Sequence, residues 1–188
     1  MPELEPVLAV AKLVDELRKA GAPPSDQDLS RLAAQVAKVF NAREGEVAIL
    51  RLSADSKALD FVFPLRLAAL GSIPVTASQS LAARNVRDKR GEIVNNFQSY
   101  RHQTVFESVK LSDEEKVAPI QKILSSPMVA EGKLAGVIQI SRKGQPGEPV
   151  GPDFTPADLA QLGTVGTILG KFFSELPPRS AKPAGGKR

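Results

Sequence analysis

The stretch with the most chemically useful side chains is NNFQSYRHQTVF, at residues 95–106. It combines amide, phenol, guanidinium and imidazole groups with flat aromatic rings. A small-molecule pocket needs this mixture, because its wall is mostly apolar and a few polar groups orient the ligand. A guanidinium can also hold a carboxylate or phosphate through paired hydrogen bonds. We therefore predict a ligand-binding set within this stretch: Asn95, Asn96, Phe97, Tyr100, Arg101, His102 and Phe106.

A purely structural interpretation of the same stretch stays open. Asparagines commonly cap turns, and the two phenylalanines could anchor a surface loop to the core. His102 is the only histidine, so a serine-type triad or a two-histidine metal site would need other partners for it. Haem needs only one axial histidine, so haem binding through His102 stays open. The sequence therefore predicts no catalytic residue and no metal site, and it leaves any cofactor unidentified.

The composition excludes several kinds of chemistry. The chain has no cysteine, which removes disulfides, thiolate metal sites, cysteine nucleophiles and covalent attachment of a cofactor through sulfur. It has no phosphate-binding loop, no G-x-S-x-G turn and no paired-histidine metal motif. We expect no enzyme activity, because nothing in the sequence pairs the available carboxylates, which are Asp60, Glu92, Glu107 and Asp113.

The charge and hydropathy limit the partners. The formal net charge is +4, and the four basic residues of the segment PPRSAKPAGGKR, residues 177–188, account for the whole excess. A neutral remainder lacks the footprint of a dedicated nucleic-acid binder, and the Pro- and Gly-rich segment is expected to be disordered. No stretch approaches the roughly 20 apolar residues of a membrane span, and the first residues lack a secretory signal. We expect a cytoplasmic protein that is not in a membrane.

Two helices are expected at the start of the chain and one near its end. Apolar residues at steps of three and four predict a helix over residues 3–20. A second helix begins at Ser25, where Asp28 three residues on completes a capping box. The last helix starts with Thr155 as its cap, Pro156 in its first turn and Asp158, and it ends near residue 176.

Between these helices the pattern changes to strands. Residues 46–55 and 58–67 form an expected hairpin whose second strand ends, or lies at a sheet edge, at Pro64. A short helix is expected over residues 78–87 and another around residues 105–109. Two further strands are expected at residues 120–131, interrupted by Pro127, and at residues 134–142. Runs of strands with helices at both ends predict an α+β fold, an antiparallel sandwich.

Three segments carry a family resemblance: GSIPVTASQSLAARNVRDKRGEIVNNF, SSPMVAEGKLAGVIQISRKG and FTPADLAQLGTVGTILGKFF. Over residues 26–175 the chain resembles GAF domains. The matching positions are Ile73, Pro74, Gly91, Pro127, Gly132, Gly136, Phe154 and Asp158. The resemblance implies a GAF-like antiparallel sheet flanked by the N- and C-terminal helices, with helices on one face and a small-molecule pocket on the other. It also implies that residues 95–106 form part of the pocket wall.

The chain departs from the signatures of several GAF functions. Free methionine sulfoxide reductases with this fold work through cysteines, and cyclic-nucleotide GAF domains carry an Asn-Lys pair and Phe-x3-Asp-Glu; both patterns are missing. The resemblance therefore implies a non-catalytic sensory or regulatory module that binds a small molecule and signals to a separate partner protein. The alternative is a homodimeric interaction scaffold with a vestigial pocket.

The terminal helices motivate the dimer. GAF domains commonly dimerise through such helices, and both helices here are apolar. Three glycines of the last helix, Gly163, Gly166 and Gly170, predict close approach by another backbone, either the domain's own sheet or the first helix of a second subunit. We expect residues 1–24 to be a possible dimerisation element, residues 25–176 to be the GAF-like domain and residues 177–188 to be the basic tail. The predicted dimer interface is Val7, Val10, Val14, Leu17, Leu162, Val165, Leu169 and Phe172.

Overall fold

The computed structural model describes residues 4–99 and 118–177. Its α-helices are α1 Leu4–Ala20, α2 Asp26–Val39, α3 Leu81–Asp88 and α4 Pro156–Glu175. Its strands are β1 Val47–Leu52, β2 Ala58–Phe63, β3 Ser72–Pro74, β4 Glu92–Val94, β5 Ile120–Ala130 and β6 Lys133–Lys143. Three short 3-10 turns complete the description: η1 Glu44–Glu46, η2 Leu67–Ala69 and η3 Phe97–Ser99. The expected short helix around residues 105–109 and the expected tail lie outside the described residues.

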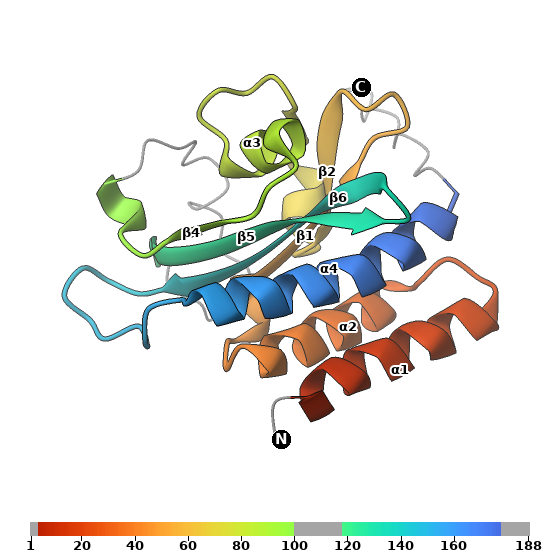
Figure 1. Cartoon of the computed structure of the whole chain (residues 1–188), viewed down its shortest axis with the longest axis horizontal. Helices are drawn as coiled ribbons and strands as arrows, with labels where there is room; N and C mark the ends of the chain where they lie inside the picture. Colours follow the sequence, from red (N-terminus) through yellow and green to blue (C-terminus); the bar gives the residue numbers. More distant parts are fainter. Residues whose placement is uncertain (1–3, 100–117, 178–188) are drawn as a thin grey trace, which may run out of the picture.

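The six strands form one antiparallel sheet with the order β3-β2-β1-β6-β5-β4. The long strands β5 and β6 are joined by a tight turn and lie beside each other near the middle of the sheet. Figure 1 shows α1, α2 and α4 on one side of the sheet and α3 on the other. The predicted α+β architecture with an antiparallel sheet and flanking terminal helices is therefore confirmed.

The helical side has two levels. α4 packs on β5 and β6, and α2 packs on β1 and β2, whereas α1 packs across α2 and α4. On this side, both helices that touch the sheet begin with a side-chain cap. The hydroxyl of Ser25 accepts from the backbone N–H of Asp28 at 3.2 Å, and the hydroxyl of Thr155 accepts from that of Asp158 at the same distance. The carboxylates of Asp28 and Asp158 in turn accept from the backbone N–H groups of Ser25 and Thr155, so both predicted capping boxes are confirmed.

In the single chain, the residues predicted to form a dimer interface pack into or against the aliphatic core. Val10, Leu162, Val165 and Leu169 are 0% exposed, and Val7 packs against the same aliphatic core from its margin. Their apolar stripes meet because α1 and α4 contact each other within the chain. All eight predicted residues belong to this core or pack against it: Val7, Val10, Val14, Leu17, Leu162, Val165, Leu169 and Phe172. In this conformation they leave almost no surface for a second subunit.

Two of the three glycines of α4 let this helix approach the sheet. A Cβ atom on Gly166 would lie 3.1 Å from the carbonyl oxygen of Pro127, and one on Gly170 would lie 3.2 Å from the carbonyl carbon of Met128. A Cβ on Gly163 would meet nothing within 4 Å. The neighbouring backbone is thus that of β5 in the same chain, and only the last two glycines contact it.

Two prolines and one serine show how the expected boundaries compare with the observed ones. β2 ends at Phe63, directly before Pro64, as predicted. Pro127 does not interrupt β5, because β4 pairs with β5 at Ile123–Ser125 and, among the strands that the structure describes, none pairs with this side of β5 at Pro127. A missing backbone N–H is tolerated at such an unpaired side. Helix α3 starts three residues later than expected, because the Ser80 hydroxyl caps it by accepting from the backbone N–H of Ala83.

Among the helices that the structure describes, none combines the length and the hydropathy needed to cross a lipid bilayer.

Candidate functional site

A cavity of about 110 Å³ lies on the face of the sheet that carries α3, opposite α1, α2 and α4. Strands β1, β2, β5 and β6 and the start of α3 all contribute to its wall. Most of the lining is apolar, with polar groups along β6 and at the start of α3. The apolar side chains are those of Val47, Ala48, Phe61, Pro64, Leu67, Ile73, Leu81, Ala82, Phe97, Ile120 and Ile123.

The alternation of β6 explains why polar groups reach the cavity. Side chains of a strand point alternately to its two faces. Ile138 and Ile140 are 0% exposed in the core under the helices. The intervening residues Gln139 and Ser141, followed by Lys143, line the cavity on the other face. β6 thus supplies an amide, a hydroxyl and an ammonium group in a row.

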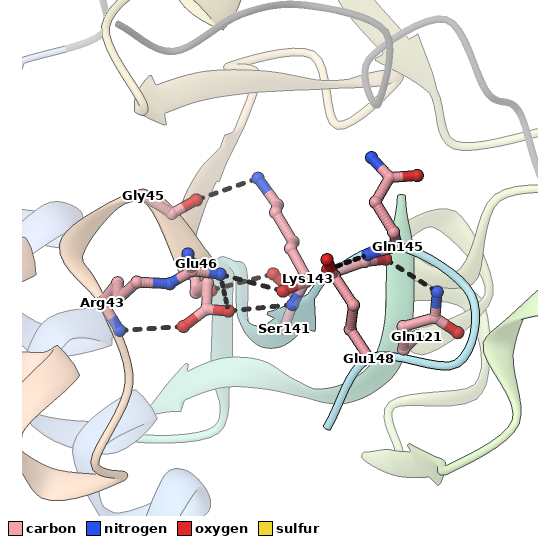
Figure 2. Close-up of polar contacts among 9 residues, drawn as sticks. Arg43, Gly45, Glu46, Gln121, Ser141, Lys143, Gln145 and Glu148 are labelled. Atoms are coloured by element: carbon pink, nitrogen blue, oxygen red, sulfur yellow. Dashed lines mark hydrogen bonds and ion pairs between the residues drawn. The ribbon is translucent and has the colours of Figure 1, made fainter. Parts of the chain in front are cut away.

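A buried carboxylate, that of Glu46, lies at one end of the cavity and makes the contacts drawn in Figure 2. Glu46 is 7% exposed, and its Oε1 accepts from the guanidinium of Arg43 at 2.7 Å and from the backbone N–H of Lys143 at 2.8 Å. Its Oε2 accepts from the backbone N–H of Arg43 at 2.9 Å. Burial alone raises the pKa of Glu46, but the hydrogen bonds from Arg43 and Lys143 and the charge of Arg43 outweigh it, so the pKa is lowered.

The same cluster joins the start of β1 to the end of β6. The ammonium of Lys143 donates to the carbonyl of Gly45 at 2.9 Å, and the guanidinium of Arg43 donates to the carbonyl of Lys143 at 2.9 Å. The Ser141 hydroxyl donates to the carbonyl of Glu46 at 3.2 Å. These contacts fix the polar end of the cavity to two neighbouring strands.

A second polar group, a chain of hydrogen bonds, runs behind the cavity from β6 to α3 and β4. Gln139 donates its Nε2 hydrogen to the hydroxyl of Ser125 at 3.0 Å, and that hydroxyl donates to Oδ1 of Asn85. Nδ2 of Asn85 donates to the carbonyl of Arg90 at 2.8 Å and to Oε1 of Glu92 at 3.2 Å. Asn85 and Ser125 are both 0% exposed. The chain therefore connects a cavity wall residue with α3 through fully buried groups.

The structure places the predicted ligand set in several surroundings. Phe97 is buried and lines the cavity. The Asn95 side chain donates to the carbonyl of Phe154 at 3.0 Å and accepts from the backbone N–H of Phe154 at 2.9 Å, which ties β4 to the loop before α4. Asn96 is exposed. Four members lie outside the described residues: Tyr100, Arg101, His102 and Phe106.

Sequence reasoning missed the cavity residues of the sheet, above all Gln139, Ser141, Lys143 and Phe61. A usable signal was present in GVIQISRK, where polar residues alternate with isoleucines inside a strand long enough to be central. Such alternation normally indicates one face in water. Here the polar face is covered by α3, so it borders a cavity.

The described residues contain no group of three or more His, Asp or Glu side chains that could hold a metal ion. The described lining of the cavity presents apolar surface and hydrogen-bonding groups.

Comparison with known proteins identifies the fold. No protein-family model matches the sequence, and no curated protein matches it. Among solved structures, the GAF domain of a phosphoenolpyruvate-protein phosphotransferase from Acinetobacter is similar, with a TM-score of 0.64, 14% identity and coverage of 93% of this chain and 94% of that one. The GAF domain of A. aeolicus nlh2, in an inactive state, has a TM-score of 0.58 and 12% identity, with coverage of 92% and 95%.

An enzyme shares the fold. Free methionine-R-sulfoxide reductase from Neisseria meningitidis, solved in complex with its substrate, has a TM-score of 0.60 and 17% identity, with coverage of 92% of this chain and 88% of that one. At such identities the comparisons establish the fold alone. The chain has the fold of a GAF domain, as its sequence resemblance predicted.

Proposed function

We propose that this chain is a non-catalytic sensory or regulatory GAF module that binds a small molecule in its cavity and signals to a separate protein. The observation that carries the proposal is the cavity itself. It lies on the face of the sheet without the three-helix layer, and apolar side chains line it together with a few placed polar groups, as in typical ligand sites. The similar reductase structure holds its substrate, which supports small-molecule binding on this fold.

The polar groups of the cavity favour binding over catalysis. The buried carboxylate of Glu46 is engaged by Arg43 and by backbone N–H groups, and its pKa is lowered. A general base or acid works best when its pKa lies near the working pH, so Glu46 is poorly suited to proton transfer. The absence of cysteine removes the chemistry of the thiol-dependent enzymes with this fold.

A physical connection between the cavity and α4 supports signalling. Ala48 of β1 lines the cavity. Three residues further along β1, the guanidinium of Arg51 donates to the carbonyl of Leu176 at 2.6 Å and to that of Pro177 at 2.7 Å. Glu175 at the end of α4 is also held by a two-bond ion pair with Arg18 of α1. A shift of β1 on ligand binding would therefore reach the end of α4 directly.

Native mass spectrometry of the freshly purified chain tests the proposal, followed by a thermal-shift screen of metabolites. We expect a bound mass that is lost on denaturation, or a metabolite that raises the melting temperature. The variant Ala48→Phe adds a large ring at the cavity wall and should abolish both effects. Ala157→Phe places the same ring on the exposed first turn of α4 and should leave them intact. Binding that survives Ala48→Phe would contradict the proposed site.

A homodimeric scaffold is a second candidate, favoured by one observation. Leu4 and Leu8, one turn apart on α1, are 59% and 56% exposed, whereas four other apolar residues of this helix are buried: Val10, Leu13, Val14 and Leu17. Sedimentation velocity should then show a dimer that dissociates when both leucines are replaced by serine. A monomer at high protein concentration would eliminate this candidate.

A further inference from the structure

The side-chain amide of Gln139 makes a hydrogen bond through its nitrogen, while its oxygen is left available as an acceptor. Its Nε2 donates to the Ser125 hydroxyl at 3.0 Å. Its Oε1 accepts no hydrogen bond from any group in the described part of the chain, although Gln139 lines the cavity. An amide oxygen can accept two hydrogen bonds. The middle of β6 therefore offers an acceptor to whatever occupies the cavity.

The hydrogen-bond chain behind the cavity determines which half of the amide is open. The carbonyl of Arg90 and the carboxylate of Glu92 can only accept, so the Nδ2 group of Asn85 must face them. Oδ1 of Asn85 then faces Ser125 and takes its only hydroxyl hydrogen. The Ser125 oxygen can consequently only accept from Gln139, which requires Nε2 on that side. A flipped amide would set two acceptors against each other.

The chain also resists rearrangement. Asn85 and Ser125 are 0% exposed, so no solvent can replace a bond that either of them loses. Glu92 is further held by Arg84, whose guanidinium donates to both carboxylate oxygens, at 2.8 and 2.5 Å. An unmade bond of a buried polar group is costly. Gln139 is therefore kept in one orientation by its hydrogen bond to Ser125, which Asn85 and Glu92 fix in turn, and none of these three residues lines the cavity.

We propose that Gln139 determines the ligand specificity of the cavity by accepting a hydrogen bond, so that the site selects small, largely apolar molecules that carry an N–H or O–H donor. This inference rests on the proposed function. Ser125, Asn85 and Glu92 are positioning residues for the amide. The Ser141 hydroxyl, whose hydrogen is used on the carbonyl of Glu46, adds acceptor lone pairs on the same strand. The aliphatic and aromatic lining disfavours a strongly hydrated ligand.

The test compares indole with benzofuran, which has the same shape but no N–H donor. Both are titrated into the full chain by two-dimensional NMR. A neutral hydrogen bond to the half-buried amide of Gln139 should make indole bind about fivefold tighter. Gln139→Leu should remove this preference, and Ser125→Ala should reduce it by freeing the amide to rotate. Gln27→Leu, on the exposed side of α2, is the matched control and should keep it.

The outcomes separate this inference from the proposed function. If both compounds bind equally to the wild-type chain and Ala48→Phe blocks both, the cavity is a ligand site but the role of Gln139 is overturned. A preference for indole that persists in Gln139→Leu overturns it as well. If neither compound binds to the wild-type chain, the inference that the site selects small apolar donors is overturned, whereas the proposed function is still decided separately by the native mass spectrum and the metabolite screen. If Gln139→Leu fails to fold, equal binding of both compounds to the wild-type chain would still overturn the role of Gln139, and Ser125→Ala then supplies the second variant.

Discussion

Replacing each glycine of α4 with alanine should separate the close approach of this helix to β5 from intrinsic helix propensity. The same change is made at Gly163, Gly166 and Gly170, in one helix, and only the neighbours differ. Gly163 has open space around its missing Cβ, whereas Cβ atoms on Gly166 and Gly170 would lie 3.1 and 3.2 Å from backbone atoms of β5. The series is therefore internally controlled.

The expected magnitudes follow from two opposing terms. Alanine in a helix interior is more favourable than glycine by about 1 kcal/mol, and at Gly163 nothing opposes this gain. At the other two positions, overpacking costs about 1–3 kcal/mol, because the contacted atoms are backbone atoms of a strand paired with β6 along its length. We expect Gly163→Ala to stabilise the fold by about 1 kcal/mol, and the other two variants to destabilise it by about 1 kcal/mol after the helical gain is included.

Thermal and urea denaturation of the three variants and the wild type supply the measurement. A difference of 1 kcal/mol corresponds to about 2–4 °C in melting temperature for a chain of this size, so the expected order is resolvable. The reasoning would be refuted if Gly166→Ala and Gly170→Ala melted at or above the temperature of Gly163→Ala. That result would mean that α4 does not lie against the backbone of β5.

Three other predictions address the cap, the buried carboxylate and the buried amide. Thr155→Ala removes the N-cap of α4 and should lower the unfolding free energy by about 1 kcal/mol, measured against Thr164→Ala on the exposed side of the helix. Because the pKa of Glu46 is lowered in the folded state, its ionised carboxylate stabilises the fold at pH values above the ordinary pKa of 4.5, and this stabilisation is lost as the pH falls through the lowered pKa. Glu46→Gln should therefore make the urea midpoint depend less on pH when it is measured from pH 7 to pH 3. Asn85→Leu leaves the hydroxyl hydrogen of Ser125 without its acceptor and the carbonyl of Arg90 without the Asn85 donor, and it should cost about 2–4 kcal/mol. An unchanged melting temperature would contradict the buried chain of hydrogen bonds.

Local signals in the sequence predicted most of the fold. Helix starts at Ser25 and Thr155 follow from capping chemistry that spans only four residues, and the structure confirms both. The start of α3 was misplaced because Ser78 and Ser80 are equivalent as isolated cap candidates. The choice between the two serines depends on where Leu81 and Ala82 lie against the cavity, and this tertiary contact is not visible in the local sequence.

The partner of an apolar face could not be predicted from the face itself. The stripe of α1 that contains Val10 and Val14 has the pattern of a dimer seam, but the chain supplies its own partners in α2 and α4. Periodicity reports that a helix buries one side and carries no information on what covers it. The glycines of α4 were ambiguous for the same reason, and the structure assigns two of them to β5.

The candidate site was hard to predict because it is not a continuous segment. The sequence analysis concentrated on residues 95–106, of which Phe97 lines the cavity. The remaining wall comes from strands that lie far apart in the chain, and the sheet order β2-β1-β6-β5 brings them together. Gln139 becomes notable only when its neighbours Ser125 and Asn85 are known, since each is an ordinary polar residue in isolation.

The composition of the two sheet faces supports a binding role for the cavity. Under the helices the sheet is covered by close-packed aliphatic side chains such as Ile138 and Ile140. On the other face, Asn85 and Ser125 occupy fully buried positions that aliphatic residues could fill without the need for matched hydrogen bonds. Departures from simple apolar packing are expected where a protein has a site to shape. Because the buried polar chain ends at Gln139, its most direct physical consequence is a fixed acceptor at the cavity wall, which a vestigial pocket would not require.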